Sequence, residues 1–247
     1  MNPIILIPAR MAASRLPGKP LADIGGQAMI VRVLRQALDA DVGPVAVAAA
    51  DQEIVEAVTE AGGRAVLTDP ALQSGSDRIL AALERLDPAG LHDVVINLQG
   101  DMPFVDASAP RAAVNLLARE GRCDIATLVA PESSPADRAN PDVVKAILAM
   151  DPDRTCGRAL YFTRASPNGE GPIWRHVGLY AYRRAALQRF CAAPPSPREI
   201  HERLEQLRAL EIGLEIHAAI VSAAPISVDT AADLEGARAI ARETSHT

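Results

Sequence analysis

Short apolar runs alternate along the chain with segments in which apolar residues recur at helical spacing. A short aliphatic run bounded by polar or turn residues predicts a strand, and apolar residues three or four positions apart predict a helix. The strands predicted in the first half are Ile4–Ile7, Val45–Ala50, Ala65–Thr68, Val94–Leu98 and Ile125–Val129, with helices near Met29–Leu38, Ile54–Val58, Ile79–Leu83 and Ala112–Leu117.

This strand–helix order predicts the α/β class, with a mostly parallel sheet flanked by helices on both faces. Ligands of such sheets bind beyond the carboxyl ends of the strands. Polar segments follow Ile7, Thr68 and Leu98, each at a predicted strand end. We therefore expect these three segments to line one cleft.

The second half is less regular. Residues 166–171 are predicted to form a turn or loop. In the first half, the helix over Ile79–Leu83 is expected to begin near Ser76 or Asp77, which are both good N-caps. The remaining predictions are strands at Val143–Ala149, Val177–Tyr182 and Ile216–Val221, a charged helix at Glu199–Leu210, and a last helix at Thr230–Arg242 capped by Asp229 or Thr230.

Composition narrows the classes of function. The 247 residues carry 25 Lys and Arg against 31 Asp and Glu, a net charge of −6, and few aromatic residues. A nucleic-acid binder needs a broad basic surface, so an anion site here must be local. Three widely spaced cysteines predict reduced thiols and argue against a disulfide framework or zinc site. Apolar runs are too short to span a bilayer. We expect a cytoplasmic protein with no nucleic-acid or membrane partner.

The first polar motif runs from Pro8 and Ala9 to Pro20. It holds three cations, Arg10, Arg15 and Lys19, around a turn at Gly18. Phosphates need cations that stay charged and exposed backbone N–H groups, so the motif is typical of a site for a nucleoside triphosphate. The motif matches neither the Walker A nor the GxGxxG phosphate-binding pattern. The alternative, a basic loop exposed to solvent with no ligand, therefore stays open.

The second motif, Gln73–Arg78, stands where a loop enters a helix. Its small residues Ser74 and Gly75 would let an anion approach the helix N-terminus. The alternative is an ordinary N-capping turn.

The third motif, Asn97–Pro103, places Asp101 directly after the buried strand. A carboxylate there commonly holds Mg²⁺, and Gly100 would let substrate pass close to the backbone. The alternative is an Asp turn before proline. Asp229 is a second candidate ligand, and its alternative role is a helix N-cap.

Two further side chains, Arg164 and His176, could hold a carboxylate or a hydroxyl-rich substrate. The alternatives are ordinary surface charge for Arg164 and a structural hydrogen bond for His176.

In this order, the motifs resemble the 3-deoxy-manno-octulosonate (Kdo) cytidylyltransferase family, from about Ile4 to Ala241. The first motif alone suits several nucleotidyltransferases, whereas the ordered set is far more specific. The segments that carry the resemblance are 7–10, 14–20, 73–78, 97–101, 161–165, 176–180, 204–208 and 228–230.

The resemblance implies a reaction in which CMP passes from CTP to Kdo, with Mg²⁺ as cofactor and pyrophosphate as the second product. It implies catalytic roles for Arg10, Lys19, Asp101 and Asp229. It implies nucleotide binding by Pro8, Ala9, Arg10, Arg15, Lys19, Ser74, Gly75 and Arg78, metal binding by Asp101 and Asp229, and sugar-acid binding by Gln99, Gly100, Arg164, His176, Tyr180, Glu205 and Gln206.

The resemblance also implies a single, Rossmann-like sheet of the nucleotide-diphospho-sugar transferase type, with a smaller sugar-binding and dimerisation lobe. Within one domain over 1–247, we expect residues 1–130 to bind nucleotide, 131–225 to bind sugar and dimerise, and 226–247 to supply the metal-binding loop and closing helix. The family forms homodimers and makes an activated sugar for lipopolysaccharide in the cytoplasm.

The chain departs from the family pattern at four places. Met102 stands where Glu is common, and Ala48–Asp51 replaces an Ala-Thr-Asp pattern, which puts a polar contact from that strand end in doubt. The loop 166–174 is short, and Ile200-His201 reverses the usual order, so His201 receives no role.

Two rival functions stay open at this point. One is a nucleotidyltransferase for another sugar acid, such as sialic acid or amino-Kdo. The other is a non-catalytic nucleotide-binding protein on the same fold.

Overall fold

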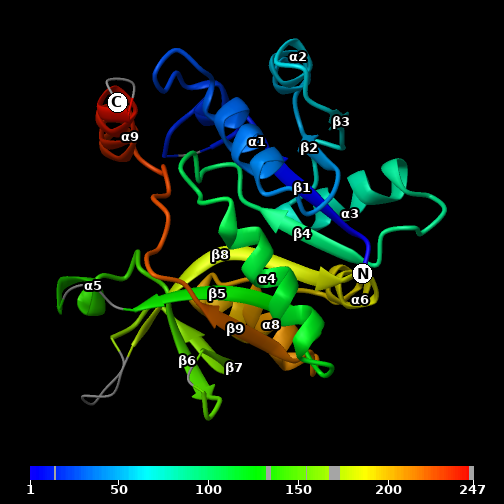
Figure 1. The fold of residues 1–247 in the computed structure, drawn as a ribbon, viewed down its shortest axis with the longest axis vertical. Helices are drawn as coiled ribbons and strands as arrows, with labels where there is room; N and C mark the ends of the chain where they lie inside the picture. Colours follow the sequence, from blue (N-terminus) through cyan, green and yellow to red (C-terminus); the bar gives the residue numbers. More distant parts are fainter. Residues whose placement is uncertain (14, 132–134, 154, 167–172, 245–247) are drawn as a thin grey trace. The chain divides into compact units, whose positions relative to one another are not determined.

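A computed structural model describes residues 1–13, 15–131, 135–153, 155–166 and 173–244 (Figure 1). Ser14 of the first motif and most of the predicted loop at 166–174 lie outside these ranges. The chain divides into two compact units. The N-terminal unit comprises 2–92, 96–108 and 225–247, and the central unit comprises 93–95 and 109–224 together with Met1.

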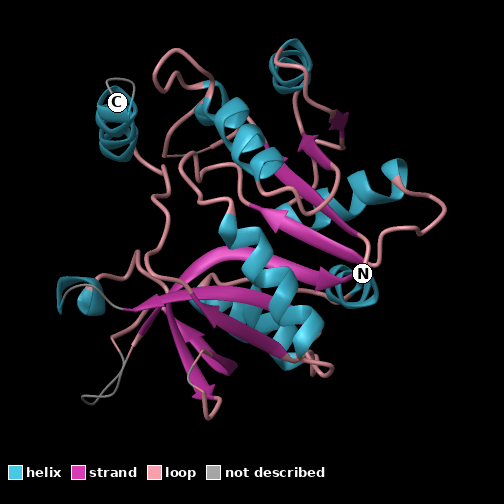
Figure 2. Cartoon of the chain, viewed as in Figure 1, coloured by secondary structure: helices cyan, strands magenta, loops and turns pink. Residues whose placement is uncertain are grey.

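The N-terminal unit has the strand–helix alternation that the sequence predicts (Figure 2). Its strands lie in the order β3-β2-β1-β4, and β1 pairs in parallel with β2, as β2 does with β3. The elements are β1 (Pro3–Ala9), η1 (Lys19–Leu21), α1 (Met29–Asp39), β2 (Val45–Ala49), α2 (Gln52–Glu60), β3 (Ala65–Leu67), α3 (Gly75–Leu86), β4 (Val94–Leu98), whose first two residues group with the central unit, and α9 (Ala231–Thr244).

Helix α3 starts earlier than predicted. Its N-cap is Ser74, whose Oγ accepts a hydrogen bond from the backbone N–H of Asp77 at 3.0 Å. The prediction of Ser76 or Asp77 as N-cap was wrong, because Ser74 already satisfies a free N–H of the first turn.

The C-terminal helix completes the core of the N-terminal unit. Leu234, Ala237 and Ala241 of α9 pack with Ile24 and Met29 in one buried cluster. Helix α9 is thereby fixed beside the segment that follows the first polar motif, which brings residues far apart in sequence together.

The central unit has a different pattern of strand pairing. Its strands follow the order β8-β5-β9-β7-β6, with β5 and β9 parallel but β5–β8, β6–β7 and β7–β9 antiparallel. The elements are α4 (Ser108–Arg119), β5 (Ile125–Pro131), α5 (Pro135–Ala139), β6 (Lys145–Met150), β7 (Cys156–Thr163), β8 (Trp174–Arg183), α6 (Arg184–Ala192), α7 (Pro197–Glu202), α8 (Gln206–Glu211) and β9 (Ile216–Ile220).

The fold is therefore α/β with mixed strand directions. Parallel pairing joins β1, β2 and β3, as predicted, whereas the central unit is largely antiparallel. One cause is the short connection between β6 and β7, because only antiparallel strands can be joined without a crossover.

The predicted helix at Glu199–Leu210 is two short helices. Arg203 adopts a left-handed conformation, with φ of 56°, and ends α7. Arg208 of α8 then turns back to donate to Glu199 of α7 at 2.6 Å, with its guanidinium over the Phe190 ring. This buried ion pair between Arg208 and Glu199 stabilises the turn that separates α7 from α8. The charge pattern of the sequence did not reveal this turn.

Within the part of the chain that the structure describes, no helix is long and apolar enough to cross a bilayer.

Candidate active site

The loop after β1 is held by contacts within the N-terminal unit. The backbone N–H of Met11 donates to Asp51 Oδ2 at 2.7 Å. Gly18 has a φ of 72°, a conformation that favours glycine, and the chain enters η1 at Lys19. The altered strand end at Ala48–Asp51 therefore keeps a polar contact, made by Asp51.

Lys19 joins the two candidate metal ligands. Its Nζ lies 3.0 Å from Asp101 Oδ2 and 3.1 Å from Asp229 Oδ1. Arg15 pairs with the other oxygen of Asp229 at 3.2 Å. Two carboxylates from distant parts of the sequence thus meet at one point, each held by a cation of the first motif.

The helix cap at α9 leaves the Asp229 carboxylate available for this contact. Thr230 Oγ1 accepts from the N–H of Asp233, and the Asp233 carboxylate accepts from the N–H groups of Asp229 and Thr230. Thr230 therefore performs the capping that was the alternative role of Asp229. The N–H of Val228 also donates to the Asp101 carbonyl at 2.9 Å, which ties the two acidic segments together.

The three predicted segments line one cavity of about 310 Å³, as the strand-end argument predicted. Their close approach requires small residues: a Cβ on Gly100 would come within 2.9 Å of the Pro8 carbonyl oxygen, and one on Gly75 within 3.3 Å of Pro8 Cγ. The lining residues are Pro8, Arg10, Ala12, Ala13, Arg15, Lys19, Pro20, Leu72, Ser74, Gly75, Arg78, Gln99, Gly100, Asp101 and Asp229.

Arg78 lines this cavity, but its guanidinium donates most of its hydrogen bonds to other groups of the protein. The residue is 2 % exposed, and it donates to Thr68 Oγ1 and to the carbonyls of Asp69 and Leu72. Burial, together with the nearby Arg10, lowers the pKa of Arg78 from its ordinary value. Arg78 therefore fixes the loop between β3 and α3.

The donor chemistry at Asp101 and Asp229 suits a hard cation. Burial raises the pKa of Asp101, and Lys19 opposes that rise. Carboxylate oxygens are the ligands that Mg²⁺ prefers, and this ion needs few of them from a protein when phosphates supply others. Met102 is 3 % exposed and does not line the cavity.

The residues predicted to bind the sugar acid lie in the central unit, except for Gln99 and Gly100. Arg164 donates through Nε to the Glu202 carbonyl and through a terminal nitrogen to the Pro141 carbonyl. The Glu202 carboxylate accepts from the N–H of Arg164 and from the Tyr161 and Thr163 hydroxyls. Glu202 thus organises the end of β7 from helix α7.

The ring of His176 on β8 contacts a hydroxyl and two aromatic rings. Its Nε2 lies 3.0 Å from Thr127 Oγ1, and its ring meets Phe162 edge-on and Tyr180 at a tilt. Burial lowers the pKa of His176 to about 3, so the ring is neutral near pH 7. Burial and the nearby Glu205 raise the pKa of Tyr180, which keeps its hydroxyl protonated. Gln206, at the start of α8, is also buried.

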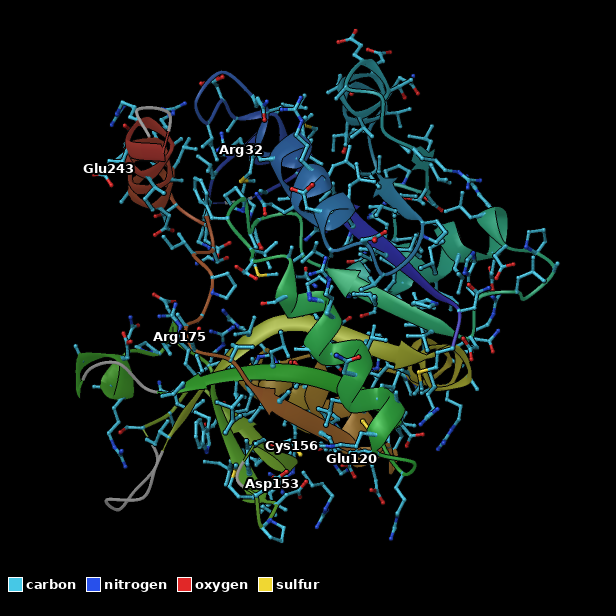
Figure 3. The ribbon with its side chains drawn as sticks, viewed as in Figure 1. Arg32, Glu120, Asp153, Cys156, Arg175 and Glu243 are labelled. Atoms are coloured by element: carbon cyan, nitrogen blue, oxygen red, sulfur yellow. The ribbon has the colours of Figure 1, made fainter. Side chains whose placement is uncertain are left out.

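A separate polar cluster lies at the end of α4 (Figure 3). The ligand atoms of Glu120, Asp151 and Cys156 lie within 4.8 Å of one another. Arg119 contacts Glu120 and the Cys156 sulfur, and the thiol donates to Asp151. Because Arg119 already supplies a cation to this cluster, its geometry is explained by hydrogen bonding within the protein.

Sequence reasoning missed four residues that shape these sites: Asp51, Thr127, Glu202 and Asp233. Asp233 had a local signal, since Thr230 and Asp233 have the spacing of a capping box. The other three act through contacts between distant segments, for which a single sequence holds no signal.

A strand-end cavity with a basic loop, a helix N-terminus and two carboxylates has the charges that a nucleotidyltransferase needs. Residues 4–216 match a family model described as cytidylyltransferase. The chain is 59 % identical to a 3-deoxy-manno-octulosonate cytidylyltransferase of Rhodospirillum centenum, over 97 % of this chain and 93 % of that protein. A relative of the same name from Parvibaculum lavamentivorans is 57 % identical over 96 % and 92 %. The chain belongs to the 3-deoxy-manno-octulosonate cytidylyltransferase family.

One solved structure agrees with this placement, and a more distant one shares the fold. A CMP:2-keto-3-deoxy-manno-octonic acid synthetase complexed with CTP superposes with a TM-score of 0.89 at 36 % identity, covering 99 % of this chain and 100 % of that one. A 4-diphosphocytidyl-2C-methyl-D-erythritol synthase from Anaerococcus prevotii, at 13 % identity and a TM-score of 0.65, covers 98 % and 99 % and shares the fold.

Proposed function

We propose that this chain transfers CMP from CTP to the anomeric hydroxyl of Kdo, giving CMP-Kdo and pyrophosphate. One observation carries the proposal: Lys19 holds Asp101 and Asp229 together in a cavity that Arg10 and Arg15 also line. A polyphosphate and a hard cation are the ligands that such a mixture of fixed positive and negative charge suits.

The triphosphate is bound by the first motif. Arg10 and Arg15 are exposed at the cavity and supply cationic donors, and Arg15 exchanges Asp229 for phosphate oxygen. Lys19 adds a third cation. Ser74 and Gly75 begin an α3 helix whose N-terminus favours anions. Pro8, Ala9 and the loop that Arg78 fixes complete the nucleotide site.

Asp101 and Asp229 would hold Mg²⁺. When bound, Mg²⁺ would offset the charge of the phosphate oxygens. Lys19 keeps the two carboxylates at one place, where their oxygens could hold such an ion. Arg10, Lys19 and the two carboxylates form the catalytic group.

Within the central unit, the residues proposed to bind the sugar acid are Arg164, His176, Tyr180, Glu205 and Gln206. Gln99 and Gly100, in the segment after β4 of the N-terminal unit, are proposed to bind it as well. The support is chemical. Arg164 is a permanent cation suited to the Kdo carboxylate, and His176 and Tyr180 are neutral groups suited to hydroxyls.

In the reaction, the oxygen of the anomeric hydroxyl forms a bond to the α-phosphorus of CTP. The bond from that phosphorus to the oxygen bridging the β-phosphate breaks, and pyrophosphate leaves with the electron pair. The hydroxyl proton passes to solvent. Arg10, Arg15 and Lys19 stabilise the charge that develops on the phosphate oxygens, and holding both substrates in place aligns the reacting atoms.

The product serves lipopolysaccharide biosynthesis, and the enzyme works in the cytoplasm, where free thiols such as its three cysteines stay reduced. Residues 1–130 and 226–247 serve the nucleotide and metal, and 131–225 serve sugar binding and dimerisation. We expect a homodimer, and Leu160 and Ile200 of the central unit, 49 % and 67 % exposed, are candidate contact residues. Sedimentation equilibrium tests this: a monomer at micromolar concentration contradicts it.

The test of function is Mg²⁺-dependent pyrophosphate release for each pairing of CTP or ATP with Kdo, amino-Kdo or sialic acid. We expect release with CTP and Kdo and background rates with ATP. A faster rate with another sugar acid would reassign the substrate. CTP binding without turnover of any sugar acid would support a nucleotide-binding protein.

A further inference from the structure

Thr127 is buried on β5, where the ladder to β8 changes register between Thr127 and Leu128. At this irregularity, its hydroxyl faces two main-chain carbonyls of β8. Thr127 Oγ1 lies 2.8 Å from the Leu179 oxygen and 3.2 Å from the Val177 oxygen. The ring of His176 approaches the same hydroxyl, with Nε2 at 3.0 Å.

The two carbonyls determine whether Thr127 or His176 donates the hydrogen bond between them. A hydroxyl has one proton, and a carbonyl oxygen can only accept. Two oxygens 2.8 Å apart need a proton between them, so the Thr127 hydroxyl donates to the Leu179 carbonyl. Its lone pair then faces His176 Nε2, which must carry a proton and donate to Thr127. A neutral ring has one N–H, so its Nδ1 is left as an acceptor.

Nδ1 is also available. Among the described residues, the hydrogen bond of the His176 ring is the one at Nε2, while its backbone N–H donates to the Val144 carbonyl. The ring is kept in place by Phe162, with centroids 4.9 Å apart, and by Tyr180, at 5.4 Å. Because burial disfavours the charged ring, His176 presents a fixed neutral acceptor.

We infer that Thr127 is a positioning residue of the sugar-acid site, which fixes His176 as the Nε2–H tautomer so that Nδ1 accepts a hydrogen bond from a hydroxyl of the substrate. This deepens the proposed function and rests on it. It separates the tasks within the site: a cation such as Arg164 pairs with the carboxylate, while His176 selects a hydroxyl donor.

Long-range proton–nitrogen NMR of ¹⁵N-labelled protein at pH 7 tests the tautomer directly, with His176→Asn assigning the ring signals. We expect Nε2 protonated, Nδ1 unprotonated, and a shift of the Nδ1 signal when Kdo is added. A protonated Nδ1, a charged ring, or an Nδ1 signal that Kdo leaves unchanged would overturn the proposal.

Kinetics test the role of Thr127. Thr127→Val keeps the shape but removes the hydroxyl, so the KM for Kdo should rise about tenfold, equivalent to one hydrogen bond, while the KM for CTP stays unchanged. Thr127→Ser should restore the wild-type KM, and Thr155→Val, at an exposed turn of the same unit, should leave it unaltered. A folded Thr127→Val with a wild-type KM for Kdo contradicts the inference.

These results separate the inference from the proposed function. If the wild-type enzyme turns over no Kdo, the proposed function fails, and the tautomer is still read from the spectrum. If Thr127→Val does not fold, the tautomer in the wild-type spectrum and the KM of Thr127→Ser for Kdo test the inference.

Discussion

Lys19 Nζ lies 3.0 Å from Asp101 Oδ2, although 82 positions separate the two residues in sequence. The contact joins the basic loop after β1 to the acidic turn after β4, which are neighbouring strands. The ion pair is therefore a product of strand order: two strand ends at the same edge of a sheet bring a cation and a carboxylate together. In the proposed function, this ion pair joins a phosphate-binding residue to a metal ligand.

The two carboxylates should be essential for turnover. Asp101→Asn and Asp229→Asn remove charge with little change of shape, so each should lower kcat by about 100-fold or more, as loss of a preorganised charge does. Pyrophosphate release at saturating CTP and Kdo measures this. Glu53→Gln, at an exposed carboxylate on α2, is the control and should retain the wild-type rate. Wild-type kcat in Asp101→Asn would remove Asp101 from the catalytic group.

Arg15 should serve CTP more than Kdo. Its guanidinium is 57 % exposed at the cavity, and its pairing with Asp229 can be exchanged for phosphate. Arg15→Ala should raise the KM for CTP about tenfold or more, the equivalent of a charge-assisted hydrogen bond, and leave the KM for Kdo within about twofold. Arg35→Ala, on the exposed face of α1, is the matched arginine control. An unchanged KM for CTP would mean that Arg15 is only a surface cation.

Arg78 should matter for stability as well as for binding. Its side chain is buried and donates to Thr68, Asp69 and Leu72. Arg78→Met would leave these acceptors without their donor, so the free energy of unfolding should fall by about 3 kcal/mol and the KM for CTP should rise. Urea denaturation gives the first quantity. A variant as stable as wild type would show that the loop between β3 and α3 does not depend on Arg78.

Two glycines should respond to alanine in opposite directions. A Cβ on Gly100 would meet the Pro8 carbonyl oxygen at 2.9 Å, so Gly100→Ala should destabilise the fold by about 1–3 kcal/mol. Gly236 in α9 has open space around it, so Gly236→Ala should stabilise by about 0.5–1 kcal/mol through helix propensity. Thermal unfolding of both variants checks the pair. Equal shifts in one direction would contradict the packing argument at Gly100.

Local sequence pattern predicted the elements that local forces specify. β1, β2 and β4 consist mainly of aliphatic residues, and the helices between them have a clear apolar face. Strand β7 was missed because Gly157 and Arg158 interrupt its apolar pattern. The break at Arg203 was missed because the charge pattern runs on across it, and a buried contact with Glu199 overrides that pattern.

The site was predictable to the same extent. Strand ends placed the three polar motifs in one cavity, since the rule concerns topology alone. The meeting of Asp229 with Lys19 spans 210 positions and depends on how α9 packs, which spacing does not reveal. Thr127 carried no signal, because its importance comes from two carbonyls of a neighbouring strand.

The most direct test of the account is ³¹P NMR of the purified enzyme with CTP, Kdo and Mg²⁺. We predict one new phosphodiester signal from CMP-Kdo, growing in step with pyrophosphate as CTP disappears, and no such signal with ATP or with Asp101→Asn. A sample in which CTP binds but no phosphodiester forms, or in which phosphate is released without CMP-Kdo, would contradict the assignment of this chain as the enzyme that joins CMP to Kdo.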